Sequence, residues 1–180
     1  MTSHRSGKLK YALIVISTTA VLAVALLQFN VVDGMSPHRR SIAEIHMLSI
    51  ALDWYKSDHG SYPSDPLSTE QLMPNLTYDP ASYIRASQFL FRALSEEPSH
   101  GTDGKLFLDR KSYFEFPSRM LRTGETGGTY IVDMAGNSYG YSTFKRLHPD
   151  NSEGNNLEYD LWSTGGGKGV KDKSKWVKNW

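Results

Sequence analysis

The sequence predicts an α+β protein in which an N-terminal transmembrane helix continues into, or is followed by, an amphipathic helix packed on a small antiparallel β-sheet. Three observations predict this class. Residues 11–32 are uncharged and largely apolar, apolar residues recur at helical spacing between residues 37 and 59, and short alternating segments gather after residue 128. Helices followed by a run of strands are typical of an α+β domain, in which a helix covers one face of the sheet.

Length and composition limit the number of domains and the kinds of chemistry that the chain can carry out. The chain has 180 residues, which allows one ordinary domain plus an appendage. Its 20 Lys+Arg and 19 Asp+Glu give a net charge of +1, so charge gives no reason to expect a nucleic-acid partner. Cysteine is absent, which excludes disulfides, thiol catalysis and cysteine-ligated metal sites.

The uncharged run 11–32 predicts a membrane-spanning helix. At ~1.5 Å per residue it extends over roughly 33 Å, close to the thickness of a hydrocarbon core. Arg5, Lys8 and Lys10 precede it, so the positive-inside rule puts residues 1–10 in the cytoplasm and residues 33–180 outside, as a head domain. The alternative is a cleaved signal peptide with a small-x-small site at residues 23–25, and either interpretation exports the head.

The next segment predicts an amphipathic helix that begins at Pro37 and ends at His59. Ser36 is the expected N-cap, Pro37 suits the first helical position, and Gly60 is the expected C-terminal stop. We expect an inward-facing apolar stripe made of Ile42, Ile45, Leu48, Leu52 and Tyr55, widened by Ala43, Met47, Ile50 and Trp54.

A second amphipathic helix is expected from Pro80, with Asp79 as its N-cap; its apolar positions run to Leu94, and Pro98 is expected to end it. Residues 61–78 are rich in turn formers, with a short helix expected at 68–72. Strands are expected at 129–132, 139–144 and 157–162, the first two joined by a turn at Gly136-Asn137. Residues 105–108 and 113–116 are further short apolar stretches.

Three stretches carry a resemblance to a known family. Residues 51–63 resemble the A-L-x-x-Y-x-x-D-x-G-x-Y-P run of the major pseudopilins of bacterial type II secretion systems. Residues 133–141 are similar to that family's D-P-x-G-x-P-Y-x-Y hairpin, and residues 159–166 with the Asn-Trp terminus are similar to its final strand. The matching positions, expected to determine the pilin-like fold, are Tyr55, Asp58, Gly60, Tyr62, Pro63, Asp133, Gly136, Asn137, Tyr139 and Tyr141.

The leader and the C-terminal loop depart from the family's pattern. Its leader has Gly followed by Phe and, at the fifth position, Glu, whereas here Gly7 is followed by Lys8 and the fifth position is Ala12. The family also binds calcium in the loop after its last strand through two or three aspartates. Here Asp172 is the only carboxylate in that loop and lysines surround it, so we expect no tight calcium site and no other cofactor.

The resemblance implies a structural role. We expect a pseudopilin-like subunit, single-pass in the bacterial inner membrane with its head in the periplasm, acting in a type II secretion or type IV pilus-like assembly. Its expected partners are membrane lipid, copies of itself or other pilin-like subunits, and the secretion machinery. The alternative is a divergent membrane-anchored interaction module that never enters a filament. An exported enzyme is a third class, but no motif in the sequence predicts catalysis.

Overall fold

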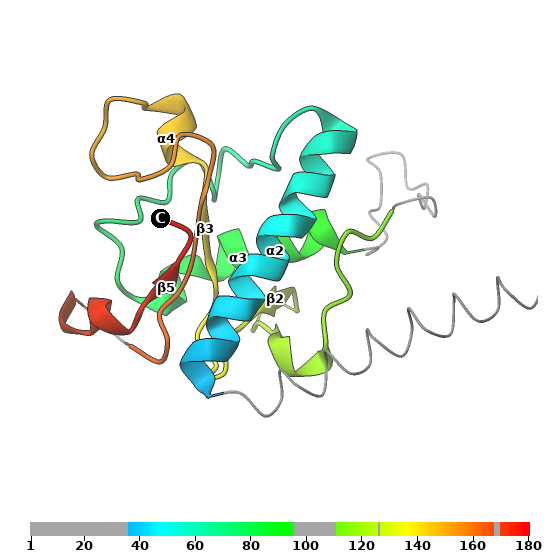
Figure 1. The fold of residues 1–180 in the computed structure, drawn as a ribbon, viewed down its shortest axis with the longest axis vertical. Coiled ribbons are helices and arrows are strands. Elements are labelled where there is room, and N and C mark those ends of the chain that lie inside the picture. Colours follow the sequence, from blue (N-terminus) through cyan, green and yellow to red (C-terminus); the bar gives the residue numbers. More distant parts are fainter. Residues whose placement is uncertain (1–35, 96–110, 126, 168–169) are drawn as a thin grey trace, which may run out of the picture. The chain divides into compact units, whose positions relative to one another are not determined.

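Helix α2, Pro37–His59, runs along the front of the head domain (Figure 1). The computed structural model describes residues 36–95, 111–125, 127–167 and 170–180. The predicted boundaries of this helix are confirmed. It ends where Gly60 takes a φ of 79° and donates its backbone N–H to the Lys56 carbonyl at 2.7 Å. That conformation favours glycine, which lacks the Cβ that makes left-handed backbone costly.

The second helix begins with a single 3₁₀ turn. Asp79 caps η1, Pro80–Tyr83, by accepting the backbone N–H of Ala81 at 3.0 Å. The chain continues directly into α3, Ile84–Leu94, so the expected cap is confirmed. The helix ends at Leu94, where Ser95 takes an extended conformation, earlier than the end expected at Pro98. Its Ser87 hydroxyl bonds the backbone of Ile131, which fixes α3 against β2.

Among the described residues, two small antiparallel sheets replace the single sheet that we expected. β1, Leu121–Thr123, pairs with β2, Thr129–Ile131. β3, Gly140–Ser142, pairs with β4, Asp160–Ser163, which also pairs with β5, Val177–Lys178. Between these two sheets, an isolated antiparallel bridge joins Val132, just after β2, to Ser138, just before β3. The remaining described elements are η2, Ser118–Met120, α4, Phe144–Leu147, and η3, Val170–Lys175.

The main core lies between the two helices and the sheets. Leu48 and Leu52 of α2 are fully buried against Tyr139, Tyr141 and Leu161 of the β3–β4 region. A second cluster surrounds Trp162 and brings together Leu72, Tyr83, Ala86 and Trp176. Gly140 allows this arrangement, because a Cβ at that position would lie 2.0 Å from the Trp162 ring.

Several local expectations are wrong. Residues 68–72 form turns in place of a helix, because the backbone N–H groups of Ser68, Thr69 and Glu70 all bond the Asp65 carbonyl. Of the two further apolar stretches, residues 113–116 are irregular, and residues 105–108 lie outside the described residues. The strand expected to reach Phe144 ends at Ser142, whose hydroxyl accepts the Phe144 N–H at 3.1 Å as α4 begins.

The prediction of an inward apolar stripe on α2 is correct for its central residues and wrong for several residues at its edges. Ile45, Leu48 and Leu52 are buried, and Tyr55 packs against the core. Ile42, Ile50 and Trp54 are exposed, because the buried face is centred on Glu44, Leu48 and Ala51 instead.

Within the described parts of the chain, no helix combines the length and hydropathy that a membrane crossing requires. The predicted span at residues 11–32 and the cytoplasmic segment 1–10 lie outside those parts.

The burial of α2 predicts a contrast between two of its apolar residues. Leu52→Ala should lower the free energy of unfolding by about 2–5 kcal/mol, because it leaves a cavity in the main core. Ile50→Ala, on the exposed side of the same helix, should cost well under half as much. Denaturant titration of the full-length protein in detergent measures both, and equal costs would contradict the packing described above.

Candidate functional site

The end of α2 places the first group of motif residues. Tyr55 lies against His59, with ring centroids 4.1 Å apart, and Asp58 accepts hydrogen bonds from Lys111 at 2.7 Å and from Tyr113 at 3.0 Å. These donors lower the pKa of the exposed Asp58 carboxyl. The residues therefore tie the end of the helix to the segment that follows residue 110.

Tyr62 and Pro63 lead the chain away from the helix. The Tyr62 hydroxyl donates to Asp53 at 2.8 Å, and its ring lies 4.6 Å from that of Tyr159. The Pro63 carbonyl accepts the buried Tyr141 hydroxyl at 2.7 Å. Two motif residues that are 78 positions apart in sequence are thus in direct contact.

The second group forms a tight hairpin around a buried aspartate. Asp133 Oδ1 accepts the backbone N–H of Ala135 at 2.9 Å and of Asn137 at 3.0 Å, which closes the turn in which Gly136 takes a φ of 80°. Its other oxygen, Oδ2, accepts the Ser163 hydroxyl at 2.7 Å. Asn137 donates to Thr164 at 2.8 Å. Both side chains therefore join the hairpin to the end of β4.

Tyr139 reaches α2 and meets a buried carboxylate that the sequence analysis missed. Its hydroxyl donates to Glu44 Oε2 at 2.7 Å, and Arg40 Nε donates to Glu44 Oε1 at 3.2 Å. Burial raises the pKa of Glu44, although these two donors act in the opposite direction. Burial also raises the pKa of Tyr139, so its hydroxyl remains a donor. Glu44 lies on the buried face but carries a charge, so apolar periodicity could not find it.

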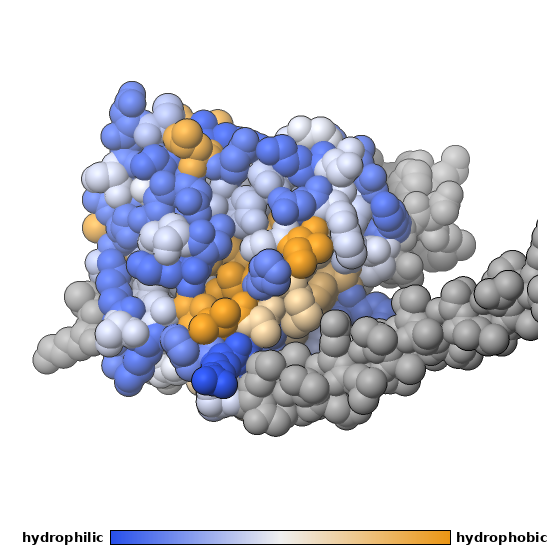
Figure 2. Space-filling model, viewed as in Figure 1, coloured by the Kyte–Doolittle hydropathy of each residue, from blue (hydrophilic) through white to orange (hydrophobic). Residues whose placement is uncertain are grey.

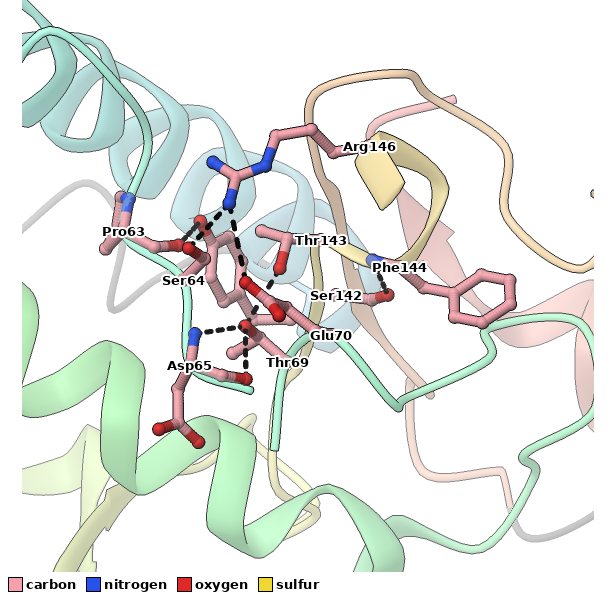
Figure 3. Close-up of polar contacts among 10 residues, drawn as sticks. Pro63, Ser64, Asp65, Thr69, Glu70, Ser142, Thr143, Phe144 and Arg146 are labelled. Atoms are coloured by element: carbon pink, nitrogen blue, oxygen red, sulfur yellow. Dashed lines mark hydrogen bonds and ion pairs between the residues drawn. The ribbon is translucent and has the colours of Figure 1, made fainter. Parts of the chain in front are cut away.

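A third connection joins the loop after α2 to the end of β3 (Figure 3). The hydroxyls of Thr69 and Thr143 are 2.9 Å apart, and the Thr143 N–H donates to the Thr69 carbonyl at 2.9 Å. Arg146 donates to Ser64 at 2.7 Å and to Glu70 at 3.5 Å. These contacts hold residues 64–70 against the sheet without any reactive geometry, since the hydroxyls bond one another and backbone groups.

The C-terminal loop places Asp172 beside a lysine. Its carboxylate lies 2.9 Å from Lys175 Nζ, in the i,i+3 position of η3. Among the described residues, no three His, Asp or Glu side chains converge to hold a metal ion. The motif residues thus form connections within the head.

Three apolar residues of α2 that were expected to face inward are exposed on the outer face of the helix. Ile42 is 49% exposed, Ile50 38% and Trp54 58%. Figure 2 shows apolar residues gathered over this front face of the head. With Ala43 and Met47 partly buried beside them, these five residues form an apolar surface that we call the α2 outer face. A single apolar patch exposed on a domain often marks an interface.

Comparisons with known proteins add no assignment. No family model matches the chain, and neither the curated proteins nor the solved structures include a significant match.

The burial of Glu44 predicts a specific pH dependence. A carboxyl whose pKa is higher in the folded than in the unfolded protein holds its proton more tightly when folded. Its contribution to stability is fully present below the unfolded pKa, near 4.5, and is lost as pH rises through the raised folded pKa. Thermal unfolding of wild type and Glu44→Gln across this range should show wild type gaining relative stability as pH falls.

A second variant tests the cause of this dependence. The Tyr139 hydroxyl lowers the pKa of Glu44, so Tyr139→Phe should move the pH-dependent range upward. A difference between wild type and Glu44→Gln that stays constant with pH would show that Glu44 is not perturbed by burial.

Proposed function

We propose that this protein is a structural, pilin-like subunit anchored in the bacterial inner membrane, with residues 1–10 in the cytoplasm and the head in the periplasm. It takes part in a type II secretion or type IV pilus-like assembly and performs no catalysis. Its partners are membrane lipid, other copies of the chain or related subunits, and secretion machinery.

The contact of all three motif stretches within one head carries this proposal. Tyr141 joins the hairpin motif to Pro63 of the helix-end motif at 2.7 Å. Asp133 joins the hairpin to Ser163 in the final-strand motif at 2.7 Å. If the three stretches belong to one family's fold, they should contact one another in the structure. The two hydrogen bonds above therefore support a real resemblance over three separate chance matches.

The α2 outer face gives a second, independent line of support. Helix α2 begins five residues after the predicted span ends. In the proposed subunit, the apolar membrane helix is therefore followed by a helix outside the membrane that also exposes an apolar surface. The span itself contains the small residues Ala20 and Ala23, which permit close approach of neighbouring helices in lipid. Lateral association along both helices is therefore the proposed mode of assembly.

Cysteine crosslinking tests this association directly, since the chain has no cysteine of its own. Ile50→Cys should form crosslinked dimers and larger species in native membranes, because the α2 outer face is buried between subunits. The matched control is Arg85→Cys on the exposed side of α3, which should stay largely monomeric. Equal crosslinking at both positions, or none at Ile50→Cys, would contradict assembly through this face.

The alternative function, an anchored interaction module outside any filament, is favoured by the leader sequence. Neither Lys8 nor Ala12 fits the positions that a prepilin peptidase and filament assembly require in the family that the chain resembles.

The mass of the mature N-terminus separates the two functions. For a filament subunit we expect processing after Gly7 and a methylated N-terminal residue at Lys8. Intact-mass and peptide measurements on protein from native membranes would report this. A chain that still begins at Met1 or Thr2 would favour the anchored module.

A further inference from the structure

The start of α2 and the turn of the motif hairpin lie together at one end of the head, and α4 lies at the other end (Figure 1). Arg40 Nη1 donates to the sulfur of Met134 at 2.8 Å, which joins the first turn of α2 to this hairpin turn. Residues 134–136, which we call the hairpin tip, are all exposed. Because Met134 is 48% exposed, the tip presents an apolar side chain at this end of the head.

The C-terminal helix η3 lies next to the hairpin tip. A Cβ added to Gly166 would lie 3.3 Å from the Cβ of Ala135. A Cβ added to the preceding residue, Gly165, would meet the carbonyl oxygen of Lys175, the last residue of η3. These close approaches put the end of η3 beside the tip, although the two segments are about 40 positions apart in sequence.

Exposed basic side chains lie on both sides of the tip. Arg39 is exposed in the first turn of α2, and Lys173 and Lys175 are exposed on η3. Lys175 pairs with Asp172 at 2.9 Å, and Lys173 Nζ lies 4.8 Å from the centre of the Tyr78 ring. Both lysine side chains stay exposed in these contacts, so both can also approach an external anion.

Carboxylates are distributed differently over the head. Near the hairpin tip, Asp79 is exposed but caps η1, and Asp133 is buried within the hairpin. Further exposed carboxylates lie at the opposite end, namely Asp53 and Asp58 in the last two turns of α2 and Asp150 after α4. An anionic surface would therefore attract the end with the tip and repel the opposite end.

We propose that the hairpin tip, the first turn of α2 and η3 form a face that lies on a membrane surface containing anionic phospholipid. This face combines an exposed apolar side chain with basic residues, and apolar burial and attraction to anionic lipid both strengthen binding at a membrane surface. The proposal rests on the proposed function, because the anchor supplies the membrane. The five residues from Val32 to Pro37 span at most about 18 Å, so the anchor holds the start of α2 near the lipid headgroups.

A fluorophore on Ala135→Cys tests this contact, since the chain has no cysteine of its own. The full-length protein is reconstituted at low density in phosphatidylcholine vesicles in which some headgroups carry a nitroxide quencher, with or without phosphatidylglycerol. The label at Ala135→Cys should be quenched more strongly when phosphatidylglycerol is present. The matched control, Ser57→Cys in the exposed last turn of α2, should show little quenching in either membrane. Equal quenching at the two sites, or no response to phosphatidylglycerol, would overturn the proposal.

Charge-removing variants test the part played by η3. Lys173→Gln with Lys175→Gln should lower the ratio of bound to unbound heads by roughly 25-fold, because each basic residue near an anionic surface contributes about fivefold. The matched pair Arg85→Gln with Arg92→Gln, exposed on α3, should be quenched as the unaltered chain is. An equal loss of quenching in both pairs would show an effect of net charge alone and would reject the assignment of η3 to this face.

Alkaline extraction distinguishes failure of this proposal from failure of the anchor. At about pH 11 lysines lose their charge, so contacts of η3 with lipid are lost while a membrane-spanning helix stays in the vesicle. Release of the chain would reject the anchor and the proposed face with it. A retained chain whose Ala135→Cys label ignores phosphatidylglycerol would reject the face alone.

Discussion

The buried carboxylate of Glu44 constrains how α2 lies on the rest of the head. A charged group on the inner face of a helix is costly unless donors reach it, and here they come from Arg40 one turn earlier and from the Tyr139 hydroxyl at 2.7 Å. Arg40 turns with α2, whereas Tyr139 lies beside β3, outside the helix. The contact between Tyr139 and Glu44 therefore constrains the rotation of α2 about its own axis.

This rotation decides which apolar residues of α2 are inside. Leu48 lies one turn after Glu44 and is fully buried with Leu52, whereas Ile42 and Ile50 turn outward. A helix rotated to bury Ile42 would carry Glu44 away from Tyr139. The same contact that orders the core thus leaves the α2 outer face open. The buried core and the exposed outer face have one cause.

Local signals in the sequence predicted the helices and the motif turns. The features that were not predicted depend on contacts between residues far apart in the sequence. Ser36-Pro37 and Gly60 mark α2 because capping depends on neighbouring residues alone. β5 contains only Val177 and Lys178, too short for any periodic pattern, and it is a strand because β4 offers an edge. Phe144 continues an alternating run, yet the Ser142 hydroxyl turns the chain into α4. Glu44 carries no local pattern, since only the topology brings it to Tyr139, 95 residues later in the chain.

The long separation between contacting segments has a consequence for how the head forms during synthesis. Lys56 of α2 bonds Glu158, which is 102 residues later in the chain, and α2 packs on β4 and β5. At ribosomal rates of ~5–20 residues per second, that interval lasts roughly 5–20 s. An isolated amphipathic helix is marginal in water, because its stability comes from packing that does not yet exist. Until β4 and β5 are made, Leu48 and Leu52 of α2 lack part of the surface that buries them, so during that interval the helix exposes apolar side chains on its inner as well as its outer side.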